Sequence, residues 1–372
     1  MPYALFVLES CLPPHKQETV VASLVGLAVL AYAVVLLSVS FSVWMYIFAR
    51  RKADLPILEQ RSTDVCHWGA IDVVVGTIGV IALIIVLAGL FMGPIDRSPG
   101  AELDLDQKIG AMWGQMIAQS LVCIGLAVTI VMRGGGGMFF GTSTAQRNED
   151  IRIGVAAFCA LCIPVIAIQV LAGYLTPYEH PLINMMIADP QPQVLIPVLI
   201  SAVLIAPLTE EFAFRLVLQG WLEDLLGGRL GRRFSILWGR TDNEVVVTPH
   251  SDPETFALTE PAETNSYDED GNPYVSPIMQ DETEFDEDVG IHVPAFQGMP
   301  ILISATLFAL LHLGQGAAPI PLFVLALGLG YVYQRTRTLT PSLVVHMLLN
   351  GQSMVLLLVQ IFFGEAAHTP PV

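Results

Sequence analysis

Seven side chains in the second half of the chain stand at spacings that suit peptide hydrolysis. Glu210 and Glu211 are adjacent, and Arg215 follows Glu211 by four residues. On a helix, Glu211 and Arg215 share one face and can pair, whereas Glu210 points about 100° away. We therefore predict that Arg215 neutralises Glu211 and that Glu210 stays available as a general base.

Two further pairs complete this candidate set. Phe308 and His312 lie one helical turn apart, and so do His346 and Asn350. Taken singly, each pair is also typical of an interfacial histidine or of a hydrogen bond between membrane helices. Ionisable groups are costly to bury in hydrocarbon, however, so several of them on consecutive apolar segments indicate a functional site.

The elements that must position these residues are membrane-spanning helices. Hydrophobic residues make up 53% of the 372 residues, charged residues only 14%, and the mean hydropathy is +0.62, which excludes a water-soluble domain of this length. We predict an all-α, polytopic transmembrane helical bundle, because a span needs roughly 20 apolar residues and about eight runs meet or approach that length. These runs are 19–48, 68–93, 111–132, 152–176, 194–214, 297–313, 319–334 and 341–363.

The distribution of Lys and Arg predicts the orientation of the bundle. Basic residues follow the first, third, fifth and seventh runs, beginning with Arg50, Arg51 and Lys52. Loops rich in positive charge stay in the cytoplasm, so both termini are predicted outside, in the plasma (inner) membrane if the cell is prokaryotic. The apolar patch at residues 4–8 has no basic region before it, and no cleaved signal peptide is expected.

The net charge of −17 comes largely from one segment. Residues 241–295 hold fifteen Asp and Glu and no Lys or Arg, including the runs at 268–270 and 286–288. This composition predicts a disordered, acidic cytoplasmic loop, and a binding segment for a protein partner is the alternative reading. No nucleic-acid partner is expected.

The remaining polar residues are interpreted as structural. The five cysteines give neither a disulfide framework nor a zinc pattern, and the C-x-x-C pair Cys159 and Cys162 reads as small packing residues. Gly134–Gly137 read as a flexible link rather than a phosphate cradle. Asp72, Gln115 and Gln119 are interpreted as interhelical or interfacial polar groups.

The three motifs E-E-x-x-x-R, F-x-x-x-H and H-x-x-x-N, in this order, resemble the CPBP family of intramembrane proteases. That family includes the CAAX prenyl endopeptidases of the Rce type and bacteriocin-processing relatives. The resemblance covers roughly residues 194–363, and every defined motif position matches. It divides the chain into a four-span region at 1–176, a catalytic core at 194–226 and 297–363, and the acidic loop at 241–295, which the shared core does not explain.

The resemblance implies that Glu210, His312, His346 and Asn350 line a cavity in the membrane, supported by Glu211 with Arg215. Glu210 and His312 would activate a water molecule, and His346 and Asn350 would stabilise the oxyanion. The expected activity is that of an intramembrane endopeptidase. Its substrate would be a membrane-associated peptide, of the prenylated CAAX type if it follows the best-known relatives.

Three alternatives stay open at this point. One Glu and two His also suit a catalytic zinc site, which would make the protein a metalloprotease, although no H-E-x-x-H is present and metal-independent water activation is slightly favoured. A catalytically silent membrane scaffold or binding protein would keep the same fold. A proton- or cation-coupled transporter is less favoured, because the chain shows no internal repeat.

The two histidines pose a geometric problem. His312 lies near the end of its apolar run, His346 lies near the start of its own, and the two helices are predicted to be parallel. Straight helices would then separate the imidazoles by about 15 Å in depth. The site therefore requires tilt, an offset or an irregular segment, and Gly314, Gly316 and Pro319 favour an irregular segment after His312.

Overall fold

The structure is a computed structural model that describes residues 14–61, 66–94, 103–134, 144–176, 181–227, 233–239 and 298–363. Within these residues all regular structure is helical, so the predicted all-α fold is confirmed. The acidic loop at 241–295, the patch at 4–8 and most of the glycine tetrad lie outside the described residues. The helices are α2 (Pro14–Lys52), α3 (Ala70–Met92), α4 (Leu105–Met132), α6 (Thr144–Leu175), α7 (Pro181–Ala188), α8 (Pro192–Ile200), η1 (Ser201–Ile205), α9 (Ala206–Glu211), η2 (Phe212–Gln219), α10 (Gly220–Leu226), α11 (Arg233–Trp238), α12 (Gly298–Leu310), α13 (Pro319–Thr336) and α14 (Leu339–Phe363).

Six helical segments are long and apolar enough to cross a membrane among the described residues, whereas eight spans were predicted. All eight predicted runs are helical, but α12 has 13 residues, about 20 Å, and α13 has 18 residues, about 27 Å. The chain leaves the helix after Leu310, and Gly314 and Gly316 then take positive φ of 98° and 61°. A left-handed backbone at two nearby positions cannot continue a helix, which is why this run is short.

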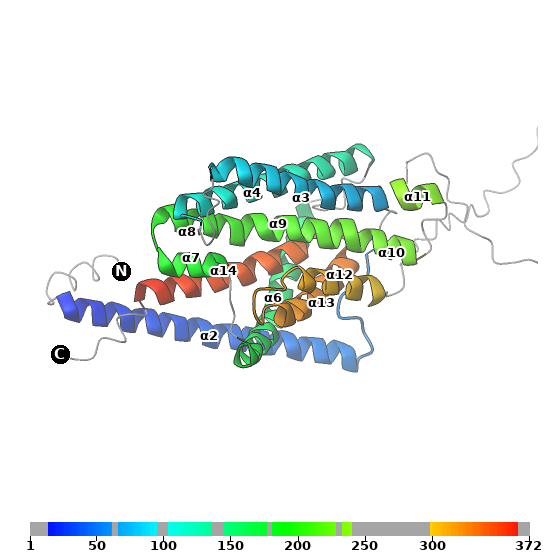
Figure 1. Cartoon of the computed structure of the whole chain (residues 1–372). Coiled ribbons are helices and arrows are strands. Elements are labelled where there is room, and N and C mark those ends of the chain that lie inside the picture. Colours follow the sequence, from blue (N-terminus) through cyan, green and yellow to red (C-terminus); the bar gives the residue numbers. More distant parts are fainter. Residues whose placement is uncertain are drawn as a thin grey trace, which may run out of the picture.

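One long rod runs through the centre of the bundle. It consists of α8, η1, α9, η2 and α10 in succession, because every residue at a junction keeps right-handed helical dihedrals. The π-helical segments η1 and η2 flank α9, which ends at Glu211. Figure 1 shows α3 and α4 on one side of this rod, with α14 on the other side and α2 outermost.

Helices α3 and α4 approach closely because α4 turns two glycines toward α3. A Cβ atom on Gly114 would lie 2.6 Å from the carbonyl oxygen of Leu87, and one on Gly110 would overlap the carbonyl of Phe91. Small residues allow such backbone contact between membrane helices. The two helices therefore form one tightly packed pair.

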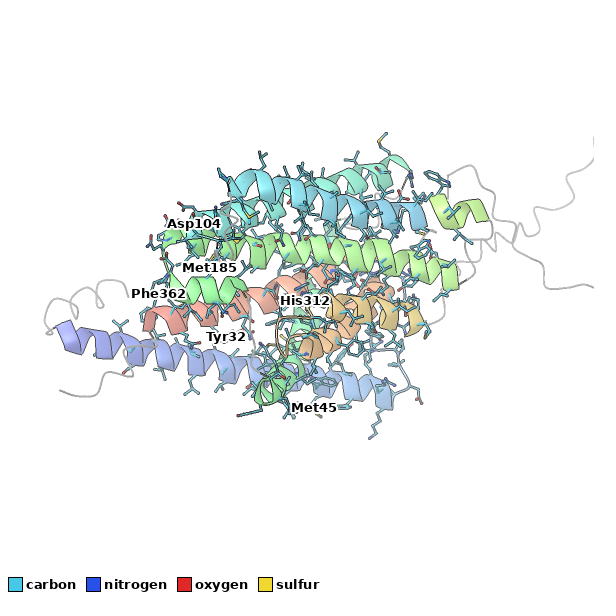
Figure 2. All side chains as sticks on the ribbon, viewed as in Figure 1. Tyr32, Met45, Asp104, Met185, His312 and Phe362 are labelled. Carbon is cyan, nitrogen blue, oxygen red and sulfur yellow. The ribbon has the colours of Figure 1, made fainter. Side chains whose placement is uncertain are left out.

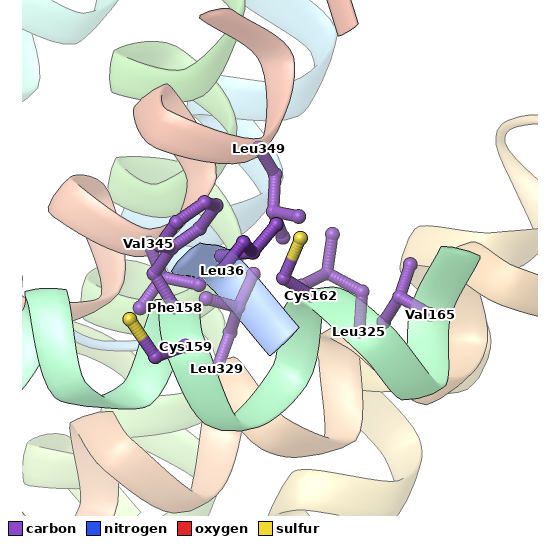
Figure 3. Close-up of a cluster of buried hydrophobic side chains, with 9 residues drawn as sticks. All are labelled: Leu36, Phe158, Cys159, Cys162, Val165, Leu325, Leu329, Val345 and Leu349. Atoms are coloured by element: carbon purple, nitrogen blue, oxygen red, sulfur yellow. The ribbon is translucent and has the colours of Figure 1, made fainter. Parts of the chain in front are cut away.

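A second core joins the N-terminal helices to the C-terminal ones. Figure 3 shows buried side chains from α2, α6, α13 and α14 in one cluster. Cys159 and Cys162 belong to this cluster, which confirms their interpretation as packing residues. Its members are Leu36, Phe158, Cys159, Cys162, Val165, Leu325, Leu329, Val345 and Leu349.

Basic residues gather at one end of the bundle, where they bind loops together. The backbone N–H of Arg61 donates to the carbonyl of Arg335 at 2.9 Å. Arg133 pairs with Asp72 at 2.8 Å and donates to the carbonyl of Trp238 at 3.0 Å. The loops after the first, third, fifth and seventh predicted runs thus lie at one end, as the predicted alternation requires. Asp72 of α3 pairs with Arg133 at the end of α4, so it is an interhelical polar group, one of the two roles predicted for it.

Candidate active site

Glu210 and Glu211 occupy the last turn of α9, directly before the π-helical segment η2. Glu211 is fully buried, and its Oε2 lies 3.3 Å from Nε of Arg215, so the pair expected from the four-residue spacing is present. The Glu210 side chain keeps 27% of its surface exposed and points elsewhere. π-Helical turns inside α-helices frequently mark functional sites, because they redirect side chains locally.

His346 connects the two glutamates. Its Nδ1 lies 2.9 Å from Oε1 of Glu211, and its Nε2 lies 3.7 Å from Oε2 of Glu210. A carboxylate paired with Arg215 only accepts hydrogen bonds, so Nδ1 of His346 carries a proton. The contact joins residues 135 positions apart, which is why the local spacing of Glu211 predicted only its partner Arg215.

The Arg215 guanidinium is held from two further sides. Nη1 donates to Oγ of Ser304 at 3.1 Å, and that hydroxyl donates to the carbonyl of Phe214 at 2.9 Å. The guanidinium carbon also lies 5.6 Å from the centre of the Phe308 ring, a cation–π distance. Ser304 is fully buried and was not among the predicted site residues, since nothing in the sequence around it shows that a guanidinium lies nearby.

Phe308 brings the two histidines to the same place. Its ring centre lies 4.9 Å from that of His312 and 6.1 Å from that of His346. His312 belongs to the turn after α12, which ends at Leu310, rather than to a continuous helix. The irregular segment predicted from the glycines is therefore present. It brings the imidazoles of His312 and His346 to the same depth, which two straight helices would not do.

His312 closes the end of its own helix. Its backbone N–H donates to the carbonyl of Ala309, so the carbonyl of Phe308 loses its usual backbone donor. Nδ1 of His312 lies 2.8 Å from that carbonyl. A carbonyl only accepts, so Nδ1 carries the proton, and Nε2 of the neutral ring keeps its lone pair.

Asn350 is anchored to the central rod through a gap in the helix hydrogen bonds. In η1 the N–H of Ala206 bonds back five residues to Ser201. The next donor in that pattern would be Pro207, which has no N–H, so the carbonyl of Ala202 lacks a backbone partner. Nδ2 of Asn350 donates to it at 2.9 Å, and its second N–H makes no hydrogen bond within the described residues.

All four predicted catalytic side chains border one cavity of about 870 Å³. Glu210, His312, His346 and Asn350 line it together with Phe308, whereas Glu211 and Arg215 lie behind its wall. Figure 2 places His312 in the middle of the bundle and Met185, which lines the same cavity, toward the end where α4 begins. The cavity therefore extends from the candidate catalytic groups toward one end of the bundle.

Gln115 and Gln119 also line this cavity. The sequence predicts interhelical or interfacial polar groups here, but neither side chain makes a hydrogen bond within the described part of the chain. Their spacing of four residues already predicted that they share a face of α4. What that face borders follows only from the packing of α4 against the central rod.

A metal ion would require several donor atoms of the site to converge on one point. Both histidines carry their Nδ1 proton toward an oxygen and leave Nε2 on the other side, which is a common arrangement in ligating histidines. Among the described residues, however, no three His, Cys, Asp or Glu side chains converge closely enough to hold a metal. The arrangement does not fit a zinc centre.

Comparison with known proteins identifies the C-terminal part of this site. The family model described as type II CAAX prenyl endopeptidase Rce1-like matches residues 291–352, which include Phe308, His312, His346 and Asn350. Glu210 precedes the matched segment. Searches of curated proteins and of solved structures found no match. Residues 291–352 are therefore similar to the Rce1-like type II CAAX prenyl endopeptidases, in agreement with the resemblance of the three motifs to the CPBP family.

Proposed function

We propose that this integral membrane protein is an intramembrane endopeptidase in which Glu210 activates the attacking water. The Rce1-like domain and the six apolar helices support a membrane-embedded endopeptidase in general. The observation that carries the assignment of residues is the cavity, because Glu210, His312, His346 and Asn350 come from three separate segments and border one space.

Glu210 suits the role of base because it is the less engaged of the two carboxylates. It reaches the cavity and has no ion pair with Arg215, which is bound to Glu211. In the proposed first step, Glu210 takes one proton from water, while Nε2 of His312 accepts a hydrogen bond from the remaining O–H and orients the molecule. The resulting hydroxide attacks the carbonyl carbon of the scissile amide.

His346 and Asn350 suit the role of oxyanion donors. The free N–H of Asn350 and an N–H at Nε2 of His346 would bind the oxygen of the tetrahedral intermediate. His346 needs a proton on each nitrogen for this role, and the charges of Glu210, Glu211, Arg215 and His346 then sum to zero. The intermediate collapses as the C–N bond breaks, and Glu210 returns its proton to the departing amine.

The proposed substrate is a membrane-associated peptide, of the prenylated CAAX type named by the family description. Away from Glu210, the cavity is bordered by apolar side chains such as Leu103, Leu105, Leu182 and Met185, together with the polar side chains of Lys108, Asn184 and Asp189. Its volume of about 870 Å³ lies in the range of small-molecule and lipid-chain pockets, roughly 300–1,000 Å³. An apolar chain attached to a peptide fits such a space.

The test compares peptide termini in membranes from cells that produce the wild-type chain or the Glu210→Gln variant at matched abundance. New termini that need Glu210 would establish proteolysis and give candidate substrates. Glu59→Gln serves as control, because the Glu59 side chain is 86% exposed in a loop. Identical profiles for wild type and Glu210→Gln, with a prenylated test peptide supplied, would contradict the proposal and favour the scaffold.

A further inference from the structure

We propose that Gln115 and Gln119 form a rail that binds the backbone of the substrate peptide in an extended conformation. The inference rests on the proposed endopeptidase function and concerns how the substrate is held beside Glu210. It assigns a binding role to two side chains that lie on α4, outside the matched family segment of 291–352.

The faces of α4 are clearly divided. Gly110 and Gly114 turn toward α3, and Met116 packs in the apolar cluster with α8. Gln115 and Gln119 belong to a third face, which borders the cavity. That face continues toward the start of α4 through Ala111 and Lys108, at spacings of three and four residues.

The rail lies between the end of the cavity near Met185 and the candidate base. Met116 shares a cluster with Val198 of the rod, and Ile130 shares another with Leu216, so α4 and the rod run side by side in the same direction. Gln119 lies between these two contact levels on α4, and Glu210 lies between them on the rod. A peptide that reaches Glu210 from the end near Met185 would pass the two carboxamides.

The spacing of the two carboxamides matches an extended peptide. Four residues of α-helix advance by about 6 Å. On one edge of an extended chain, equivalent backbone groups recur every two residues, about 6.6–6.8 Å apart. Because a carboxamide both donates and accepts, two of them at this spacing can bind consecutive outward-facing N–H and C=O groups of one strand edge.

A peptide in this environment needs such partners. Backbone N–H and C=O groups that enter a water-poor membrane interior must be satisfied by the protein. The carboxamides of Gln115 and Gln119 make no hydrogen bond within the described residues, whereas those of Gln107, Gln219 and Gln352 each have a partner. Carboxamides without partners near the middle of a membrane helix, such as these two, are costly unless they serve a ligand or a solvated cavity.

The test uses the purified full chain in lipid vesicles and a fluorescent prenylated peptide. The variants are Gln115→Met and Gln119→Met, which keep side-chain length but remove the donors and the carbonyl. Gln169→Met is the matched control, because Gln169 is an exposed carboxamide on α6 that does not border the cavity. Peptides with a single N-methylated amide at successive positions remove one backbone donor at a time.

We expect each cavity variant to lower kcat/KM about 3- to 10-fold, mainly through KM, as the loss of one hydrogen bond predicts. The matched N-methylated peptide should show the same loss with wild type and little further loss with the variant, because both changes remove the same bond. Gln169→Met should behave like wild type.

Binding measured in the Glu210→Gln background separates this inference from the proposed function. Peptide affinity there does not depend on cleavage, and we expect it to fall about 3- to 10-fold when either glutamine is replaced. Wild-type affinity in both variants, or losses that add fully to those of N-methylation, would overturn the rail. Absence of cleavage by wild type, with binding that still requires the glutamines, would overturn the protease and leave the rail standing.

Discussion

Two buried glutamates on the same central rod each pair with an arginine, and they differ in their other contacts. One carboxylate oxygen of Glu211 pairs with Arg215, and the other accepts a hydrogen bond from His346, whose opposite ring edge faces the cavity. Glu223 pairs with Arg337 and also accepts from Gln219 at 2.8 Å. Both carboxylates are fully buried. The same type of ion pair thus holds His346 beside the cavity in one place and the connection between α13 and α14 in the other.

The largest expected loss of activity is that of Glu210, which lies near the Glu211–Arg215 pair and far from the Glu223–Arg337 pair. Replacement of Glu210 by Gln should lower turnover of a prenylated peptide by about 10²–10⁴-fold, the usual contribution of a general base. The melting temperature of the purified protein should stay unchanged, because Glu210 makes no ion pair with Arg215. An active Glu210→Gln protein would show that another group is the base, and Glu59→Gln provides the comparison.

Removal of Glu211 should damage both folding and activity. Glu211→Ala leaves Arg215 buried without its partner, which typically costs about 3–5 kcal/mol, and it frees His346 to rotate. Chemical denaturation in detergent would measure the loss of stability. The double variant Glu211→Ala with Arg215→Met should recover much of that stability while staying inactive. Recovery of activity in the double variant would mean that Glu211 does not position His346.

Removal of Glu223 should have a similar cost in stability and none in catalysis. Glu223→Ala leaves the buried Arg337 without its ion-pair partner, which again lowers the free energy of unfolding by about 3–5 kcal/mol. At a temperature where the variant is folded, its kcat per folded molecule should equal that of wild type, because no contact of Glu223 reaches the cavity wall. A selective loss of kcat would show that the two pairs are coupled along the rod, and the Glu223–Arg337 pair would then not be purely structural.

Asn350→Ala should lower kcat by about 10²-fold, as loss of one oxyanion donor commonly does. Asn350→Asp keeps the shape of the side chain but has no N–H for the carbonyl of Ala202, so it should be at least as damaging. Steady-state kinetics with the two variants provide the test. If KM rises while kcat stays at the wild-type value, Asn350 binds substrate instead of the oxyanion.

The smallest expected effect is that of metal removal. Incubation with 1,10-phenanthroline followed by gel filtration should leave cleavage unchanged, since the described donors do not converge on one point. Metal content measured on the same sample gives the control. Loss of activity that added zinc restores would make Glu210, His312 and His346 ligands and would replace the water-activation mechanism.

Local spacing predicted the parts of the site that lie on one helix. The pairing of Glu211 with Arg215 and the shared face of Phe308 and His312 follow from helix geometry alone. Hydropathy located all eight helical runs. Hydropathy overestimated the length of α12, because composition does not reveal where two glycines with positive φ end a helix.

Contacts between segments that are distant in the sequence could not be predicted from residue spacing. The hydrogen bond from His346 to Glu211 depends on how α14 crosses the rod, and the polar face of α4 gains its meaning only from the cavity beside it. Ser304 is the clearest case, because a single serine in an apolar helix gives no sign that it receives a guanidinium.

Pro207 has a consequence that reaches across two helices. Because this residue lacks an N–H, the carbonyl of Ala202 is left for Asn350, and an ordinary residue at 207 would supply a rival donor from the rod itself. A carboxamide that lost this competition would be released to turn in the cavity. The orientation of one catalytic candidate is thus set by an atom that is missing from another helix, three residues before the proposed base.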